Sequence, residues 1–452
     1  MAKVKTSFFC QNCGTQHPQW QGQCRGCKEW NTLVEEVLEK QTNPIATPAK
    51  TAKRVAVPTH IDVVDLQQHQ RMSTHDAELD RVLGGGIVPG AVVLLGGEPG
   101  IGKSTLLLQL SLQLNGKVLY VSGEESEQQI KMRAARMQNS NSNCYLLAET
   151  RTENILMQLA QQQADLVVID SIQTLHTDTI DSGAGSVSQI KASAAALIAY
   201  AKAQQTPIVL VGHITKEGAL AGPKILEHMV DTVLQFEGDR NHVYRILRAQ
   251  KNRFGATSEI GIYQMQAQGL QAVDNPSSIL LSEHASALSG HAIAATIEGI
   301  RPLFVEVQAL VSTAVYGTPQ RNSTGFNSKR LNMLLAVLEK RAGFSLGTKD
   351  VFINIAGGLH VEDAALDLAV VAAILSSDLD STLSNTIAFA AEVGLSGEIR
   401  PVAQLEQRIR EAAKLGFKTV VVSKFSSVQI EEKNIRVQAF EKIEEVVAFL
   451  FS

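Results

Sequence analysis

The stretch GGEPGIGKST, residues 96–105, decides the fold of this 452-residue chain. It follows the apolar run AVVLLG and opens a segment with helical periodicity, so it is expected to join a strand to a helix. Gly97, any four residues, Gly102, Lys103 and Ser104 have the spacing of a phosphate-binding loop. Glycines let the backbone amides turn onto phosphate oxygens, and the helix N-terminus adds a favourable field. The stretch therefore predicts a nucleoside triphosphate site.

Each residue type in this loop has an expected task. Lys103 is expected to act as a catalytic group that reaches the β- and γ-phosphates, and Ser104 is expected to ligate Mg²⁺. The loop thus indicates ATP and Mg²⁺ as cofactors. The residues expected to bind the nucleotide and its metal are Gly97, Glu98, Pro99, Gly100, Ile101, Gly102, Lys103, Ser104, Thr105 and Asp170.

The region from about residue 60 to 275 alternates between predicted strands and helices. Near-continuous apolar strands separated by helices are typical of a parallel sheet that is covered on both faces. The predicted strands are 91–96, 118–123, 166–170, 207–212, 232–237 and 243–250, and the predicted helices are 104–114, 126–137, 152–163 and 186–204.

Carboxylates follow two of these strands. Asp170 ends the run LVVID, where an acid can hold Mg²⁺ through water. Glu124 and Glu125 follow the run VLYVSG, at the sheet edge where ligands bind in open α/β folds. We favour Glu124 as the residue that orients the attacking water, with Glu125 as the alternative. The other acid is then a helix-start residue that interacts with the helix dipole.

Four of the five cysteines lie within residues 10–27, in two C-x₂-C pairs that are ten residues apart. Two such pairs supply four thiolates in a tetrahedron, so this module is expected to bind Zn²⁺ and to depend on it for folding. Trp20, Trp30 and Leu33 are expected to cover the metal, and the remaining Cys144 is expected to be a buried core residue. The predicted zinc ligands are Cys10, Cys13, Cys24 and Cys27.

Composition limits the remaining possibilities. The net charge is −4, from 41 basic and 45 acidic residues, so any nucleic-acid surface must be local. The N-terminus does not look like a signal peptide, and the apolar runs are too short to span a bilayer. A cytoplasmic protein with no membrane partner is expected.

Two longer stretches resemble known families. HDAELDRVLGGGIVPGAVVLLGGEPGIGKSTL (75–106) with VLYVSGEES is similar to the RecA-type ATPase core. KNRFG (251–255) with HITKEGALAGPKILEHMVDTVL (213–234), after a four-cysteine module, closely resembles the bacterial RadA (Sms) family of DNA repair proteins. This resemblance implies a DNA-dependent ATPase in homologous recombination that drives branch migration as a ring-forming, helicase-like motor. It implies single-stranded and branched DNA, a homo-oligomer such as a hexameric ring, and the RecA recombinase as partners.

Lys251 and Arg253 are two residues apart after a predicted strand, so their side chains are expected on the same side. The family resemblance implies that such a pair reaches the γ-phosphate of a neighbouring subunit as a catalytic group. Direct DNA contact and a solvated loop remain as alternatives. Residues 171–186 and 215–228 are expected to be loops that face DNA, or else ordinary surface loops.

Residues from about 285 to the C-terminus are similar to the proteolytic domain of Lon, which needs a serine nucleophile and a lysine base. The serine position falls near Ala365 or Leu366, and Arg408 holds the lysine position. Because a guanidinium does not release its proton at neutral pH, we predict an α+β scaffold without peptidase activity. Residues 321–341 predict a helix with one buried face and basic ends, which contact either DNA or solvent.

The expected architecture has four parts: a zinc module (1–39), a linker (40–58), a RecA-like parallel-sheet P-loop ATPase domain (59–275) and a Lon-protease-like α+β domain (276–452). The leading hypothesis is a DNA-dependent ATPase in recombinational repair. The alternatives are an ATP-dependent Lon-like protease and a regulatory ATP-binding or kinase module.

Overall fold

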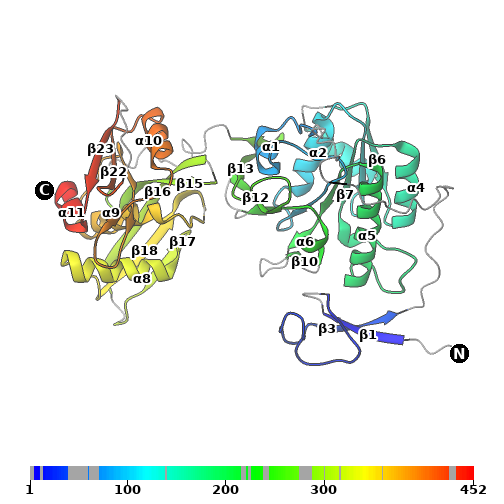
Figure 1. Cartoon of the computed structure of the whole chain (residues 1–452), viewed down its shortest axis with the longest axis horizontal. Helices are drawn as coiled ribbons and strands as arrows, with labels where there is room; N and C mark the ends of the chain where they lie inside the picture. The colour runs from blue at the N-terminus through cyan, green and yellow to red at the C-terminus, as the bar shows by residue number, and fades with distance from the viewer. Residues whose placement is uncertain are drawn as a thin grey trace. The chain divides into compact units, whose positions relative to one another are not determined.

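The computed structural model describes residues 5–10, 14–38, 60, 71–137, 140–214, 220–221, 225–237, 244–273, 288–299, 301–314, 317–358, 360–426 and 434–451. The chain divides into two compact units, Met1–Ala272 and Val273–Ser452, and each is described by itself (Figure 1). The predicted linker, 40–58, lies outside the described residues.

The N-terminal module is a three-stranded antiparallel sheet in the order β2-β1-β3. Its strands are β1 Lys5–Cys10, β2 Gln16–His17 and β3 Leu33–Leu38. Cys10, Cys24 and Leu33 form its small buried core, and Cys10 pairs with Leu33 across β1 and β3. Two of the predicted zinc ligands therefore make up most of the interior of this module.

The ATPase region is built on a nine-stranded sheet in the order β14-β13-β12-β11-β4-β8-β7-β5-β6. The six strands from β11 to β6 are parallel, and the prediction of parallel strands is confirmed for β4, β5, β7, β8 and β11. Strand β6 was not predicted, and β12, which was predicted with the parallel strands, is antiparallel, as are β13 and β14, so the sheet is mixed. Only six residues connect β11 to β12, too few for the crossover that a parallel pair requires. The strands are β4 Val92–Gly96, β5 Val118–Ser122, β6 Cys144–Ala148, β7 Leu166–Asp170, β8 Ile208–Val211, β11 Thr232–Glu237, β12 Tyr244–Asn252, β13 Ile260–Gln266 and β14 Gly269–Ala272.

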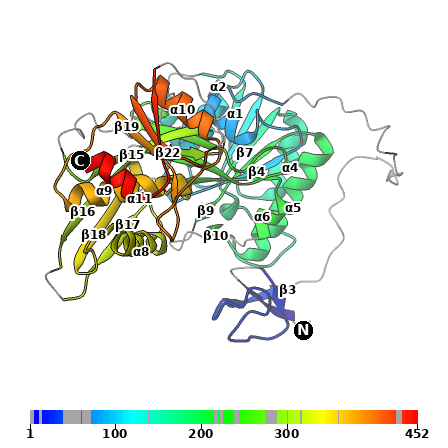
Figure 2. The same cartoon turned by 60° about the vertical axis from the view of Figure 1, so that its left-hand side comes forward.

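Helices cover both faces of this sheet (Figures 1 and 2). Strand β4 shows why its sequence is continuously apolar: Val93 and Leu95 pack on one helical layer, and Val92 and Leu94 pack on the other. The first layer contains α1 Ala77–Leu83, α2 Lys103–Gln113 and α3 Glu127–Ala134, and the second contains α4 Thr152–Gln162, α5 Val187–Gln204 and α6 Ile225–Met229. A 3₁₀ turn, Ile172–Thr174, and the short strands β9 His213–Ile214 and β10 Leu220–Ala221 complete this region.

The C-terminal unit is an α+β domain, as predicted, with a mixed sheet in the order β17-β18-β16-β15-β19-β22-β23. Helix α9 Asp367–Asp378 is buried along most of its length and packs on β15 and β16. The strands are β15 His291–Glu298, β16 Arg301–Thr313, β17 Arg321–Thr324, β18 Lys349–Ile355, β19 Ile387–Ala390, β22 Thr419–Ser423 and β23 Arg436–Phe440, with a separate pair, β20 Glu392–Val393 and β21 Ile399–Arg400. The other helices are α8 Ser328–Val337, which continues as a π turn Leu338–Ala342, α10 Leu405–Lys414 and α11 Ile443–Phe451.

Within the described part of the chain, no helix has both the length and the apolar character needed to cross a bilayer.

Candidate active site

The phosphate-binding loop lies between β4 and α2, where the sequence predicts it. Gly97, Gly100 and Gly102 have φ values of 153°, 80° and 122°, a backbone that favours glycine. A Cβ on Gly102 would lie 3.0 Å from Met265 Cε and 3.2 Å from Leu270 Cδ1. The loop therefore needs glycine at this position both for its conformation and for its close packing.

Lys103 is the first residue of α2, and its ammonium group folds back over the loop. Its Nζ donates to the carbonyl oxygens of Gly97 at 2.7 Å and Glu98 at 2.9 Å, and the residue is only 4% exposed. Burial lowers the pKa of Lys103 to about 8, although the charges of Asp170, Glu124 and Glu98 oppose this shift. Phosphate oxygens would give the buried ammonium the countercharge it needs.

Asp170 is the last residue of β7, which lies next to β5, and its carboxylate is held by a side chain of β5. The hydroxyl of Tyr120 donates to Asp170 Oδ2 at 2.6 Å, and both residues are buried. Burial raises the pKa of Tyr120 well above its ordinary value, so the phenol keeps its proton and remains a donor. A carboxylate at Asp170 and a hydroxyl at Ser104 are the hard oxygen ligands that suit Mg²⁺.

The two candidate glutamates have different partners. Glu124 Oε1 accepts a hydrogen bond from the hydroxyl of Ser171 at 2.7 Å. Glu125 instead pairs with Arg133 on α3, whose Nη1 donates to Glu125 Oε1 at 3.0 Å. The structure therefore brings Glu124 to the residues that follow β7 and turns Glu125 toward a surface helix. The catalytic role of Glu124 remains a prediction.

Close backbone packing explains the glycine that precedes these acids. The amide of Gly123 donates to the carbonyl of Asp170 at 2.9 Å. A Cβ on Gly123 would lie 2.0 Å from Thr174 Oγ1, so no side chain fits. This contact fixes the segment that carries Glu124 against the end of β7.

Lys251 and Arg253 lie at the opposite edge of the sheet from the phosphate loop. Because β12 runs antiparallel to β11, its last residue, Asn252, pairs with Thr232 at the start of β11. Thr232 in turn pairs with Val93, near the start of β4. The cations are therefore close to the beginning of β4, whereas the phosphate loop follows its end.

Both cations contact the segment 227–231. Lys251 Nζ donates to the carbonyl oxygens of Glu227 at 2.7 Å and Val230 at 2.8 Å, at the end of α6. Arg253 Nη1 lies 3.2 Å from Asp231 Oδ1. Burial and the nearby guanidinium lower the pKa of Lys251. In the single chain, the pair is held by its own subunit.

The residues between and after these cations anchor the motif. Asn252 Nδ2 donates to the carbonyl oxygens of Val82 at 3.3 Å and Leu83 at 3.2 Å, and its Oδ1 accepts from the amide of Phe254 at 3.0 Å. Arg71 Nη2 donates to the carbonyl of Phe254 at 2.6 Å. No pattern in the sequence pointed to Arg71, because it lies 183 positions away from its partner, Phe254.

Three cysteines converge in the N-terminal module, as predicted. The Sγ atoms of Cys10, Cys24 and Cys27 all lie within 4.8 Å of one another, and Cys13 lies outside the described residues. Cys10 Sγ and Cys27 Sγ are 3.6 Å apart, close to the ~3.8 Å edge of a tetrahedron with zinc–sulfur bonds of ~2.3 Å. The three thiols therefore fit Zn²⁺.

Comparisons with known proteins agree with these three parts. Family profiles match the rubredoxin metal binding domain at residues 8–35, the AAA domain at 58–219 and subunit ChlI of Mg-chelatase at 306–426. DNA repair protein RadA of Bacillus subtilis is 48% identical over 426 residues and 93% of both chains. The RadA proteins of Listeria monocytogenes serovar 1/2a (49% over 431 residues, 94% and 93% covered) and Streptococcus pyogenes serotype M1 (46% over 455 residues, both chains fully covered) are similar. The chain belongs to the RadA family.

A solved structure, the crystal structure of the RadB recombinase, matches 45% of this chain and all of that chain, with a TM-score of 0.38 and 21% identity. Membership of the RadA family, together with the AAA domain, makes this chain an ATP-hydrolysing enzyme of DNA repair. Its cofactors are ATP, Mg²⁺ and Zn²⁺, as predicted.

Some sequence predictions for this RadA-family chain need correction. Trp20 and Trp30 are 57% and 67% exposed, so they do not cover the metal, whereas Leu33 is buried. Cys144 is half-buried on the edge strand β6 rather than in the core. His17, which the sequence analysis missed, is buried, and its Nε2 lies 3.4 Å from Cys24 Sγ.

The predicted DNA loops are also different in detail. Residues 171–186, which were predicted to face DNA or to form an ordinary surface loop, are anchored to α5. The buried side-chain amide of Gln189 donates to the carbonyl oxygens of Thr177, Ile180 and Ser182 at 2.7–3.1 Å. In the second loop, residues 215–219 and 222–224 lie outside the described residues.

The Lon-like domain lacks the serine–lysine dyad at the positions that the sequence indicates. Ala365 and Leu366 are fully buried apolar residues. The Arg408 guanidinium is 3% exposed, and its Nη1 donates to Asp363 Oδ2 and to the carbonyl of Ala295, both at 2.6 Å. A buried ion pair therefore engages the residue that the sequence comparison with Lon assigns to the position of the base.

The predicted helix at residues 321–341 is shorter than expected, since α8 begins at Ser328. Its leucines at positions 331, 334, 335 and 338 are fully buried, as predicted. Arg330 is not a free basic group, because its Nε donates to the buried Asp367 at 3.0 Å and its Nη2 to Glu392 at 3.0 Å. These contacts raise the pKa of Arg330 further.

Proposed function

We propose that this chain is a DNA-dependent ATPase of recombinational repair in which subunits of a ring complete each other's nucleotide sites. The ring moves on single-stranded or branched DNA and promotes branch migration, with the RecA recombinase as a partner. One observation carries the proposal: Lys251 and Arg253 are placed where they cannot reach the phosphate loop of their own chain.

The distance follows from the strand geometry. The amide of Asp231 donates to the carbonyl oxygen of Val92 at 3.0 Å, and the amide of Val92 donates to Asp231 Oδ2 at 3.1 Å. Five residues of extended strand, or about 16 Å, separate Val92 from Gly97, where the phosphate loop begins. An arginine or lysine side chain anchored beside Asp231 is too short to span this distance. A second copy of the chain offers a phosphate loop that the pair can reach.

The chemistry of phosphate transfer gives such an arrangement a purpose. Lys103, Ser104 and Asp170 supply the charges and the metal ligands that hold ATP, and Glu124 orients the attacking water. Negative charge on the transferred phosphate is stabilised by cations that a partner supplies in trans, which can accelerate hydrolysis by about 10³–10⁵-fold. Hydrolysis then requires an assembled ring.

Contacts with DNA are the less detailed part of the proposal. Lysine residues and backbone amides in the segment 215–228 are proposed to hold phosphates without reading bases, so binding is salt-sensitive and independent of sequence. The adjoining helix α6 contacts Lys251 through its last carbonyl groups. A DNA contact at this segment would therefore act directly on one of the two cations.

The rival functions have less support. An ATP-dependent protease needs a nucleophile and a base, and the corresponding positions hold Ala365 and the ion-paired Arg408. A regulatory kinase module would not need the zinc ribbon or the KNRFG motif. Detectable cleavage of casein would favour the first rival, and autophosphorylation without stimulation by DNA would favour the second.

Mixing two inactive variants tests the trans arrangement directly. Lys103→Ala removes the phosphate loop lysine but leaves the cation pair, and Lys251→Ala does the opposite. Each variant alone is expected to lose DNA-stimulated hydrolysis, and their mixture is expected to regain part of it, because some sites then combine an intact loop with an intact neighbour. A mixture that stays as inactive as its components would refute the proposal.

A further inference from the structure

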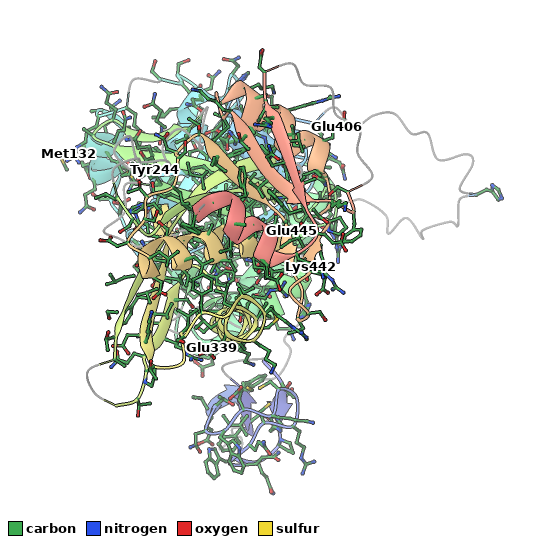
Figure 3. The ribbon with its side chains drawn as sticks, turned by 90° about the vertical axis from the view of Figure 1, so that its left-hand side faces the viewer. Met132, Tyr244, Glu339, Glu406, Lys442 and Glu445 are labelled. Carbon is green, nitrogen blue, oxygen red and sulfur yellow. The ribbon has the colours of Figure 1, made fainter. Side chains whose placement is uncertain are left out.

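The first charged residue of β12, Arg245, is buried at the phosphate loop. The strand begins at Tyr244 (Figure 3), and Arg245 is 6% exposed. Arg245 Nε donates to the carbonyl oxygen of Ile101 at 3.2 Å, and Nη1 donates to the carbonyl of Tyr244 at 2.9 Å. Residues 240–253 contain five cations and no acid, a pattern that by itself predicts a positive surface stripe, but Arg245 points into the protein.

The contact with Ile101 has a geometric consequence for the phosphate loop. In a planar trans peptide, the carbonyl of one residue and the amide N–H of the next point in opposite directions. A guanidinium that holds the Ile101 carbonyl on the β12 side therefore directs the Gly102 N–H away from β12. That amide immediately precedes Lys103, and amides at this position of such a loop bind phosphate oxygens.

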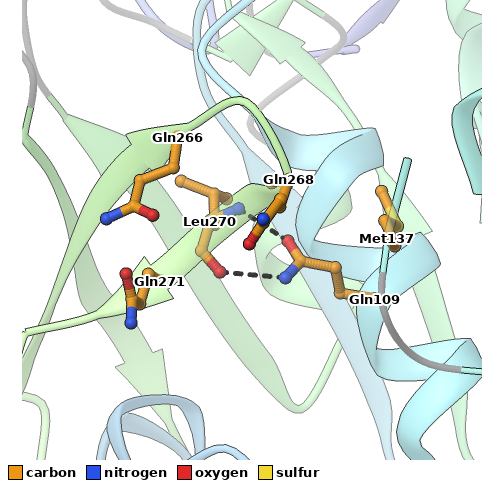
Figure 4. Close-up of a pocket in the computed structure, with 7 residues that line it drawn as sticks. Gln109, Met137, Gln266, Gln268, Leu270 and Gln271 are labelled. Atoms are coloured by element: carbon orange, nitrogen blue, oxygen red, sulfur yellow. Dashed lines mark hydrogen bonds between the residues drawn. The ribbon is translucent and has the colours of Figure 1, made fainter.

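The hairpin that follows β12 supports the same part of the loop. Met265 on β13 and Leu270 on β14 approach Gly102 so closely that a Cβ there would have to displace one of these side chains. The Gln109 amide of α2 forms two hydrogen bonds with the backbone of Leu270, at 2.9 Å and 2.8 Å (Figure 4). A polar pocket lies beside these two hydrogen bonds and is lined by Gln109, Met137, Gln266, Gln268, Gly269, Leu270 and Gln271.

Strand β12 also carries Lys251 near its other end, and Arg253 directly follows its last residue, Asn252. Six residues, or about 20 Å, separate Arg245 from Lys251, and β11 and β13 pair with the strand on its two sides. At the far end, Arg253 contacts Asp231, whose carboxylate accepts the amide of Val92 at the start of β4. Strand β12 therefore contacts the phosphate loop near its first residue. Near its last residue, it is linked through Asp231 to the beginning of β4, the strand that leads into the phosphate loop.

We propose that Arg245 is a positioning residue that aims the Gly102 amide at the bound phosphates and thereby ties β12 to the nucleotide. Through β12, the nucleotide held by one subunit sets the position of the cations that the same subunit offers to its neighbour. The second statement rests on the proposed function, whereas the first concerns a single chain and does not.

Three variants separate hydrogen bonding from packing. Arg245→Met keeps most of the volume but removes the donor, Arg245→Lys retains one charged donor, and Arg248→Met is the control on the same strand, where Arg248 pairs with Glu237 at 3.4 Å. Binding of a fluorescent ADP to each full-length variant is measured by titration. Because the Gly102 amide is then no longer held in the direction that suits a phosphate oxygen, Arg245→Met is expected to bind ADP at least tenfold more weakly. Arg245→Lys is expected to recover part of the loss, and Arg248→Met to bind normally.

The outcomes are distinct. Wild-type affinity in Arg245→Met, or an equal loss in Arg248→Met, would overturn the assignment. The link along β12 is tested by amide hydrogen exchange of the wild-type chain, where ADP is expected to slow exchange in residues 244–253, and in Arg245→Met this effect should be lost. If ADP did not change hydrogen exchange in residues 244–253 of the wild type, the link would be overturned. This measurement can be made even if Arg245→Met does not fold. Failure of the mixing experiment with Lys103→Ala and Lys251→Ala would instead count against the proposed function, because the ADP titration does not depend on a neighbour.

Discussion

The hydroxyl of Ser171 donates a hydrogen bond to Glu124 Oε1 at 2.7 Å, which joins the second residue after β5 to the first residue after β7. This contact separates two adjacent acids that the sequence alone leaves nearly equivalent. Glu124 is held at the edge of the sheet near Asp170 and Lys103, whereas Glu125 is held by Arg133.

Exchange of each acid for its amide tests this separation. Glu124→Gln is expected to lower the rate of ATP hydrolysis by about 10²-fold or more, because an amide cannot act as a base, while ADP affinity stays near the wild-type value. Glu125→Gln removes only a half-exposed ion pair and is expected to hydrolyse ATP normally. Steady-state ATPase assays with single-stranded DNA provide the comparison. Equal losses in the two variants would contradict the assignment.

Nucleotide binding is expected to weaken at alkaline pH. Burial lowers the pKa of Lys103 to about 8, below its ordinary value of 10.5, so the ammonium loses its proton as the pH rises through 8. Phosphate binding favours the charged form, and ADP affinity is therefore expected to fall about tenfold between pH 7.5 and 9. Lys103→Arg stays charged over this range and is the control. If the ADP affinity of the wild type changed with pH as little as that of Lys103→Arg, burial would not lower the pKa of Lys103.

Loss of Lys251 is expected to uncouple ATP hydrolysis from work on DNA. Lys251→Ala leaves the phosphate loop at the other edge of the sheet intact, so ADP affinity should not change, but branch migration and stimulation by DNA should be lost. Lys202→Ala is a suitable control, since Lys202 Nζ lies 4.0 Å from Asp231 Oδ1 without belonging to the motif. Branch migration by Lys251→Ala at the wild-type rate would refute the role given to this residue.

His17 is expected to slow the release of zinc. Gln21 Nε2 lies 2.9 Å from His17 Nδ1, and because an amide nitrogen only donates, Nδ1 accepts and Nε2 carries the proton toward Cys24 Sγ. A donor to a metal-bound thiolate fixes its orientation, and loss of such a group commonly weakens metal binding by about 10–100-fold. His17→Phe is expected to lose zinc to a chromogenic chelator faster than the wild type, and Gln23→Ala should not. Equal release rates for His17→Phe and the wild type would exclude this role.

The Arg408–Asp363 pair is expected to stabilise the Lon-like domain. Arg408→Met leaves the carboxylate of Asp363 without its buried partner, which typically costs about 3–5 kcal/mol. Arg410 lies on the same helix but forms only an exposed pair with Glu406, so Arg410→Met should change stability by less than about 1 kcal/mol. Hydrogen exchange of residues 291–426 in the full chain measures the effect. Similar protection in both variants would mean that the buried pair is not needed for stability.

The site was predictable where its residues are contiguous. The phosphate loop, its helix and the zinc-ligand spacing are set by backbone geometry over a few residues, so their patterns hold whatever surrounds them. The buried parallel strands between residues 92 and 237 were also predictable, because burial on both faces leaves a continuous apolar run that needs no knowledge of the neighbouring strands. The partly exposed edge strand β6 has no such run and was missed.

Only the tertiary structure determined the contacts between residues that are far apart in the sequence. Because β12 runs antiparallel to β11, Lys251 and Arg253 lie at the edge of the sheet opposite to the phosphate loop of their own chain. The same direction brings Arg245 to Ile101, 144 positions away. The tertiary structure also removed Arg245 from the apparent positive stripe, and it gave Glu124 and Glu125 different partners. A run of residue types specifies local conformation, but the partner of a long charged side chain depends on which strands become neighbours, and only the folded sheet fixes that order.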